Sequence, residues 1–174
     1  QQKLKRLRRN RATTIDGADI ELNANIELPE DVASAKENGA TGVGLFRTEF
    51  LFLNRGDLPS EDEQFEAYRQ VVRNMKSSCI TIRTFDLGAD KQPEGYARVA
   101  PNPALGQRAI RLCLAEPQLF HHQLRAILRA SNYGRIRILI PMLSNVREID
   151  QSLRLIAEAK ESLDIGGIAY DRKI

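Results

Sequence analysis

The chain has 174 residues, of which 42% are apolar and 28% charged, with a formal net charge of +3. These values are typical of one globular domain with a sizeable core. No apolar run approaches the roughly 20 residues of a membrane-spanning helix, and no signal-peptide pattern stands at the start. The two cysteines, Cys79 and Cys113, have no metal-binding spacing, so we expect neither a disulfide framework nor a zinc site, in a cytoplasmic protein.

Six of the first eleven residues are basic, and the remaining chain holds 20 basic against 23 acidic residues. We interpret residues 1–11 as the end of a charged inter-domain helix or linker. The alternative is a nucleic-acid-binding arm. The segment has no aromatic residue to stack on bases, so we expect no nucleic-acid partner. The chain begins at Gln1 and ends in a loop-like stretch, and we expect a fragment of a longer protein.

The first predicted elements are strands and a helix. Residues 13–15 predict a short strand before an Asp-Gly turn. Apolar and polar residues alternate over 20–26, which is the period of a strand. A helix begins with the proline and acids of 29–31 and ends at Asn38-Gly39.

The next apolar run, 42–46, predicts a buried strand that ends in Arg47-Thr48-Glu49. Its glycines do not complete GxGxxG and we expect no helix directly after it, so we reject a dinucleotide-binding fingerprint. Ser60 and Glu63 then form a capping box that opens a helix.

The second half repeats this alternation of strands and helices. A strand over 79–84 again ends in Arg-Thr, and two helices follow at about 104–115 and 117–131. A strand over 135–140 precedes a last helix that Asn145 and Glu148 can cap. Its predicted apolar stripe consists of Val146, Ile149, Leu153, Ile156 and Leu163.

This order predicts an α/β fold with a parallel sheet and right-handed crossovers. An open doubly wound sheet and part of a (β/α)₈ barrel both fit. A whole barrel needs about 250 residues, so the chain is long enough for only about half of one.

Two predicted strands end in an arginine, Arg47 and Arg83. Ligands of parallel β/α folds gather at the C-terminal ends of the strands, and guanidinium groups bind phosphate or carboxylate oxygens in pairs. We therefore predict one anion site that contains both arginines. The alternative is that each arginine pairs with a local acid, Glu49 or Asp86.

Four further residues are candidates for chemistry. Lys91 follows the second strand and can reach the same anion. Arg108 lies near the start of a helix, where a cation does not stabilise the helix, so a functional role is favoured. His121 and His122 lie among apolar residues of an amphipathic helix, and we expect a structural or surface role for both.

Six stretches together resemble the enzyme I family, the phosphoenolpyruvate–protein phosphotransferases of the bacterial sugar phosphotransferase system. The resemblance covers nearly the whole chain from about residue 12. Pyruvate phosphate dikinase and phosphoenolpyruvate synthase share the arginine positions but match the intervening residues less well. The resembling stretches are 39–52, 58–68, 82–91, 102–111, 123–131 and 140–142.

The resemblance implies that residues 12–174 are the N-terminal half of a (β/α)₈ barrel that binds phosphoenolpyruvate and Mg²⁺ and forms a homodimer. It implies that Arg47 and Arg83 hold the substrate phosphate and that Arg108 also belongs to the substrate site. The phosphoryl group then passes to a histidine on another domain and on to the carrier protein HPr, which initiates sugar uptake.

The family's Mg²⁺ ligands, a third phosphate arginine, the cysteine acid and the phosphorylated histidine have no counterpart in this chain. Neither histidine and neither cysteine of the chain matches them. We therefore expect no catalytic residue here and a segment that is inactive alone. The sequence leaves open whether the parent is a sugar-specific, nitrogen-related or fused form, and which carrier it uses.

Overall fold

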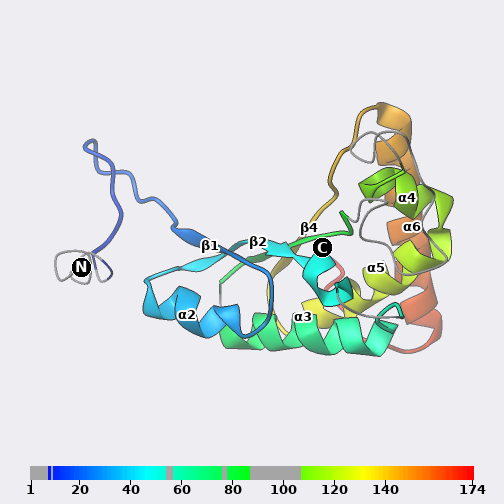
Figure 1. Ribbon diagram of the computed structural model, residues 1–174, viewed down its shortest axis with the longest axis horizontal. Helices are drawn as coiled ribbons and strands as arrows, with labels where there is room; N and C mark the ends of the chain where they lie inside the picture. The colour runs from blue at the N-terminus through cyan, green and yellow to red at the C-terminus, as the bar shows by residue number, and fades with distance from the viewer. Residues whose placement is uncertain (1–7, 9, 54–56, 76–77, 87–106) are drawn as a thin grey trace.

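The computed structural model describes residues 8, 10–53, 57–75, 78–86 and 107–174. Four parallel strands form one sheet in the order β1-β2-β3-β4, so each strand lies beside its neighbour in the sequence (Figure 1). Consecutive order without a reversal is how a (β/α) barrel begins, whereas a doubly wound sheet reverses direction. The strands are β1 (Asn23–Ile26), β2 (Gly42–Arg47), β3 (Ile80–Arg83) and β4 (Ile136–Leu139).

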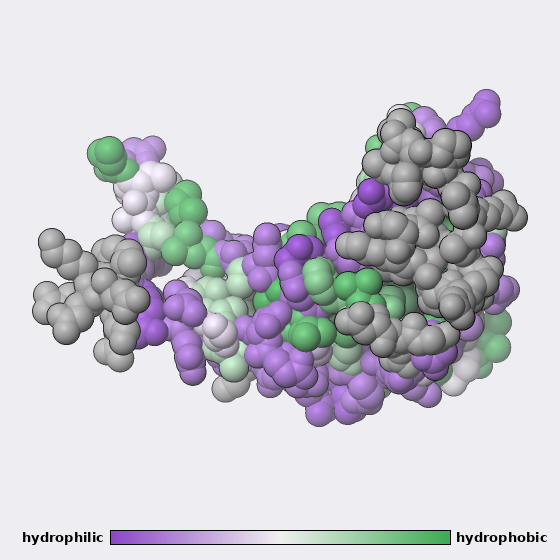
Figure 2. Space-filling view, in the orientation of Figure 1, coloured by the Kyte–Doolittle hydropathy of each residue, from purple (hydrophilic) through white to green (hydrophobic). Residues whose placement is uncertain are grey.

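The helices lie mainly on one side of the sheet. Figure 1 shows α2 and α3 beneath the strands, while α4, α5 and α6 gather at one end. Figure 2 shows the opposite side hollowed between the N-terminal hairpin and this helical end. The helices are α2 (Asp31–Glu37), the 3₁₀ helix η1 (Thr48–Phe52), α3 (Glu61–Met75), α4 (Ala109–Ala115), α5 (Pro117–Ser131) and α6 (Val146–Ile165).

The hydrophobic core lies between the sheet and its helices. Alternate strand residues such as Phe46, Ile80 and Ile82 are fully buried against α3 and α5. The Phe46 and Tyr68 rings meet edge to face, with centroids 5.8 Å apart. Because side chains alternate across a strand, Arg47 and Arg83 are turned to the opposite, open face.

Several sequence-based boundaries are confirmed. Ser60 N donates to Glu63 Oε2 at 2.8 Å, and Glu63 N donates to Ser60 Oγ at 3.2 Å, which is a reciprocal capping box. Glu148 N likewise donates to Asn145 Oδ1 at 3.1 Å. Gly39 has a φ of +90° directly after α2, a backbone conformation that favours glycine.

The strand predicted over 20–26 is shorter in the structure. Only Asn23–Ile26 pairs with β2, and Ile20 and Leu22 are about half exposed. The reason is a competing hairpin, because Thr13 pairs with Asp19 and Ile20 N donates to the carbonyl of Ala12.

Three other expectations needed correction. A 3₁₀ helix, η1, follows β2 at once, although no helix was expected there; the incomplete glycine pattern still argues against a dinucleotide fingerprint. The helix predicted from about 104 begins at Ala109. The apolar stripe of α6 is only partly buried, since Leu163 is inside but Val146 is 71% exposed.

Among the helices that the structure describes, none combines the length and the apolar character that a membrane span requires.

We predict that Ser60→Ala lowers the free energy of unfolding of the 174-residue chain by about 1 kcal/mol, because the first turn of α3 loses its cap. Urea titration followed by circular dichroism measures the change. Gln70→Ala, an exposed position on the same helix, is the control and should differ from the unmodified chain by less than about 0.5 kcal/mol. Equal effects of the two substitutions would contradict the capping assignment.

Candidate functional site

Arg47 and Arg83 lie side by side at the C-terminal ends of β2 and β3. They are direct partners in the register of the two strands, so their side chains leave the same face of the sheet. The structure therefore brings together the two arginines that the sequence placed at strand ends. Two adjacent guanidinium groups repel one another unless acids or a bound anion compensate their charge.

Acidic side chains partly compensate this charge. Arg47 pairs with Glu27, which follows β1, and Arg83 pairs with Glu49 of η1. Arg83 Nη1 also lies 3.4 Å from Asp86 Oδ2. The local pairing weighed from the sequence thus occurs for Arg83, whereas the partner of Arg47 is Glu27, which the sequence reasoning missed.

Arg108 joins the same group of charges through Asp86. Its Nη2 and Nε lie 2.7 and 3.1 Å from Asp86 Oδ1. Arg108 occupies the N-cap position of α4 in an extended conformation, without a capping hydrogen bond from its side chain. Asp86 therefore links Arg83 to Arg108, and the strand register places Arg47 beside Arg83.

Buried polar atoms of this site lack partners among the described residues. Arg47 Nε, Arg83 Nε and Glu49 Oε2 are buried and make no hydrogen bond there. A buried donor without a partner costs about 1–3 kcal/mol. These two donors on adjacent strands make the strand ends a candidate site for a ligand that offers acceptor oxygens.

Glu49 and Arg83 form the most buried ion pair of this group, with side chains 10% and 19% exposed. The neighbouring Arg47 and Glu27 are 36% and 39% exposed. Arg47 also lies over the Phe50 ring, 5.1 Å from its centroid. Arg83 is thus held more firmly, and Arg47 is the more accessible arginine.

The structure does not support a catalytic role for the histidines or for Cys113. Burial and the nearby Arg125 lower the pKa of His121, and its other charged neighbours are Glu61 of α3 and Glu158 of α6 rather than the arginines at the strand ends. Burial raises the pKa of Cys113 to about 12, so the thiol stays protonated, as expected for a small buried residue. Lys91 and residues 102–106 lie outside the described residues.

The described residues offer no evident metal centre. Among them, no group of three or more His, Cys, Asp or Glu side chains is placed to hold a metal ion. The carboxylates nearest to the arginines, Glu27, Glu49 and Asp86, are all engaged by guanidinium groups. The part of the chain that the structure describes therefore does not fit a Mg²⁺ site.

A buried polar network behind the arginines was not predicted from the sequence. Gln123 of α5 contacts Thr48, Tyr68 and the backbone of Phe85. Burial raises the pKa of the Tyr68 phenol, so this group remains a neutral hydrogen-bond donor. A glutamine on the apolar side of an amphipathic helix was the available signal in the sequence.

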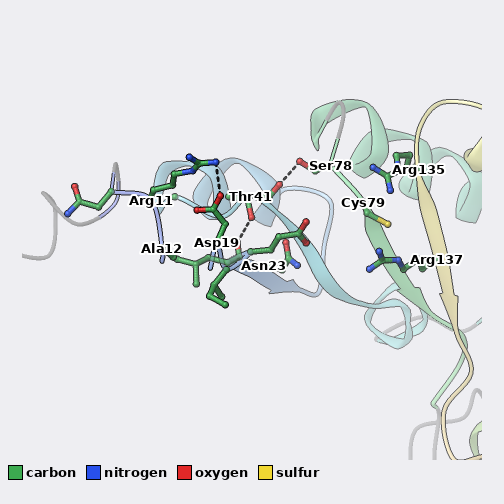
Figure 3. A pocket seen from close by; sticks show the side chains of 14 residues that line it. Arg11, Ala12, Asp19, Asn23, Thr41, Ser78, Cys79, Arg135 and Arg137 are labelled. Carbon is green, nitrogen blue, oxygen red and sulfur yellow. Dashed lines mark hydrogen bonds and ion pairs between the residues drawn. The ribbon is translucent and has the colours of Figure 1, made fainter. Parts of the chain in front are cut away.

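A pocket of about 380 Å³ lies near the N-terminal ends of the strands, away from the arginines at their C-terminal ends. Figure 3 shows Arg135 and Arg137 beside Cys79, facing Asp19 and the residues near the start of β1. Ligands of parallel β/α folds bind at the C-terminal ends of the strands instead. Arg47 and Arg83 are therefore the candidate functional site.

The fold is an α/β arrangement of four consecutive parallel strands, with Arg47 and Arg83 at the C-terminal ends of two of them. The family model of the PEP-utilising enzymes, PEP-binding domain, matches residues 1–174. The chain therefore belongs to this family.

Similar proteins carry one name. The chain is 56% identical over 173 residues to the phosphoenolpyruvate-protein phosphotransferase of Cupriavidus necator, covering 97% of this chain and 30% of that protein. It is 48% identical over 160 residues to the protein of that name from Bacillus subtilis, covering 91% of this chain and 28% of that protein. The chain thus spans less than a third of the length of these curated relatives.

We predict that Glu49 and Arg83 are energetically coupled in the 174-residue chain. A double-mutant cycle with Glu49→Gln and Arg83→Gln should give a coupling of about 1–3 kcal/mol in urea unfolding, because the pair is largely withdrawn from water. The exposed pair Asp164–Arg172, with side chains 42% and 75% exposed, should give less than about 1 kcal/mol. Coupling no larger than that of this control would show that the pair is not held as described.

Proposed function

We propose that the chain is part of a phosphoenolpyruvate–protein phosphotransferase and supplies arginines that hold the phosphate of phosphoenolpyruvate. The observation that carries this proposal is the direct pairing of Arg47 with Arg83 at the C-terminal ends of β2 and β3, with a buried Nε of each lacking a partner among the described residues. Membership in the PEP-utilising family supports phosphoenolpyruvate as the anion.

The chemistry requires positioning and compensation of charge. In phosphoryl transfer the bond from phosphorus to the enol oxygen breaks, a bond to the acceptor forms, and the phosphoryl oxygens carry the negative charge. Each guanidinium offers five N–H donors in a fixed plane, and only some of them are engaged by the acids. Arg47 and Arg83 would hold the phosphoryl oxygens, while Arg108, linked through Asp86, belongs to the same substrate site.

The remaining machinery is proposed for the longer protein. The consecutive strand order and the helices on one side support the N-terminal half of a (β/α)₈ barrel over residues 12–174, with 1–11 as the linker before it. We propose that Mg²⁺ ligands and the phosphorylated histidine lie elsewhere in that protein, which acts as a cytoplasmic homodimer on an HPr-type carrier in sugar uptake. Lys91 stays a proposed further ligand of the phosphate.

The alternatives are less well supported. The curated relatives quoted above are named phosphotransferases, which does not favour a phosphoenolpyruvate synthase or pyruvate phosphate dikinase relative. A nucleic-acid-binding module would depend on the basic residues 1–11, and no observation on the described residues favours it.

We predict that Arg47→Ala and Arg83→Ala each lower kcat/KM of the full-length protein for phosphoenolpyruvate by about 10³-fold or more, because each removes a positive charge that compensates the transferred group. Phosphoenolpyruvate-dependent phosphorylation of the protein is the assay. Arg172→Ala is the matched control, since this exposed arginine pairs with Asp164 of α6 and with none of the acids beside Arg47 and Arg83. It should leave the rate within twofold.

Near-normal turnover of either Arg47→Ala or Arg83→Ala would refute the proposed phosphate site. The isolated 174-residue chain serves as a further arm of the same assay. We expect it to transfer no phosphoryl group, and transfer by this chain alone would show that the catalytic groups lie within it.

A further inference from the structure

Gln123 is a fully buried amide at the centre of a polar network in the core. Its Nε2 donates to Thr48 Oγ1 at 3.0 Å and to the Tyr68 hydroxyl at 3.2 Å. Its Oε1 accepts from Phe85 N at 2.9 Å. Both N–H groups and the carbonyl oxygen are therefore used, so the cost of burying the amide is offset.

Two of these contacts lie next to the arginines of the site. Thr48 follows Arg47 in the chain, and its Oγ1 donates to the carbonyl oxygen of Arg83 at 2.8 Å. Phe85 is two residues beyond Arg83, and its N–H is the group that Gln123 binds. Gln123 of α5 thus binds the backbone of Phe85 directly. It also binds the hydroxyl of Thr48, which in turn donates to the carbonyl of Arg83.

The network begins where the sheet no longer joins β2 to β3. Arg47 and Arg83 are the last register pair between these strands. Beyond them, Thr84 N donates to the carbonyl of Leu139 on the β4 side, whereas on the β2 side the connection runs through Thr48 and Gln123. The polar network therefore fixes the backbone geometry from which both guanidinium groups extend.

An apolar side chain of similar size would pack in this core without fixing any backbone group. Tyr68 extends the network away from the site, because its hydroxyl donates to Gln64 Oε1 at 3.2 Å, and Gln64 Nε2 donates to the carbonyl of Pro59 at 3.1 Å. The network thus has one branch toward the arginines and one toward α3. The two branches allow a positional role to be separated from a purely structural one.

We propose that Gln123 is a positioning residue for the phosphate site: it holds the ends of β2 and β3 so that Arg47 and Arg83 converge on one phosphate. This inference rests on the proposed function. Thr48 transmits part of the effect through its hydroxyl. Neither residue touches the substrate.

The test measures the dissociation constant of phosphoglycolate, a carboxylated phosphate monoester without an enol leaving group, by calorimetry on the full-length protein. Gln123→Leu and Thr48→Val should weaken binding about 10-fold, similar to the lower range found for residues that orient metal ligands. Thr48→Ser keeps the hydroxyl and should bind like the unmodified protein. Gln64→Leu cuts the branch beyond Tyr68 and leaves the contacts of Gln123 in place, so it should lower the melting temperature but change the dissociation constant less than twofold.

Equal effects of Gln123→Leu and Gln64→Leu on binding would overturn the proposal and leave the network a structural one. So would equal effects of Thr48→Val and Thr48→Ser, a comparison that remains decisive if Gln123→Leu fails to fold. Arg83→Lys separates this failure from failure of the proposed function. If Arg83→Lys does not weaken binding, the phosphate site itself is wrong, whereas weak binding by Arg83→Lys with normal binding by Gln123→Leu rejects only the positioning role.

If Gln123 acts through Arg83, the two substitutions should not be additive. Combining Gln123→Leu with Arg83→Lys should then weaken binding less than the product of the single effects. Fully multiplied effects would contradict action through Arg83.

Discussion

The structure of the site depends on the placement of two like charges at adjacent strand ends. Parallel pairing of β2 and β3 sets Arg47 directly beside Arg83, and the cost of that arrangement is reduced by Glu27, Glu49 and Asp86. The acids compensate the charge without using every donor, since a buried Nε on each arginine has no partner among the described residues. The charge at these strand ends is therefore compensated only in part by hydrogen bonds among the described residues.

The rest of the fold holds these strand ends in position. Apolar residues on one face of the sheet pack against α3 and α5. A second cluster packs η1 and Phe85, the second residue after β3, against α4, α5 and α6. Phe52 and Phe85 meet edge to face within that cluster, with centroids 4.2 Å apart. The segments that directly follow both arginines are therefore buried, and the arginines extend from a rigid base toward the open face.

Local patterns predicted much of this arrangement. The two apolar runs that end in Arg-Thr predicted β2 and β3, and they predicted that Arg47 and Arg83 lie together at the C-terminal ends of these strands. Both predictions rest on local properties, the side-chain period and the direction of the strand. The capping box at Ser60 is likewise local. The alternation at Ile20 and Leu22 wrongly extended the predicted strand to residue 20. A period of two indicates an extended backbone, but it does not show whether a neighbouring strand pairs with that backbone.

Contacts between distant parts of the chain were not predictable in this way. Glu27 reaches Arg47 across 20 residues, and Gln123 reaches Thr48 across 75. Such pairs depend on how strands and helices pack, which no local pattern encodes. The same holds for the α6 stripe, whose period correctly gave a helix but did not show that Val146 and Leu153 remain exposed among the described residues.

The central claim is that Arg47 and Arg83 bind one phosphate together. It is tested most directly by nuclear magnetic resonance of the arginine Nε–H groups in the full-length protein during titration with phosphoglycolate. Both signals, assigned with single Arg→Lys variants, should shift with the same dissociation constant, while the Nε–H of Arg125, which donates to Glu61, should not shift. A shift of only one of the two signals, or of neither, would contradict the shared phosphate site.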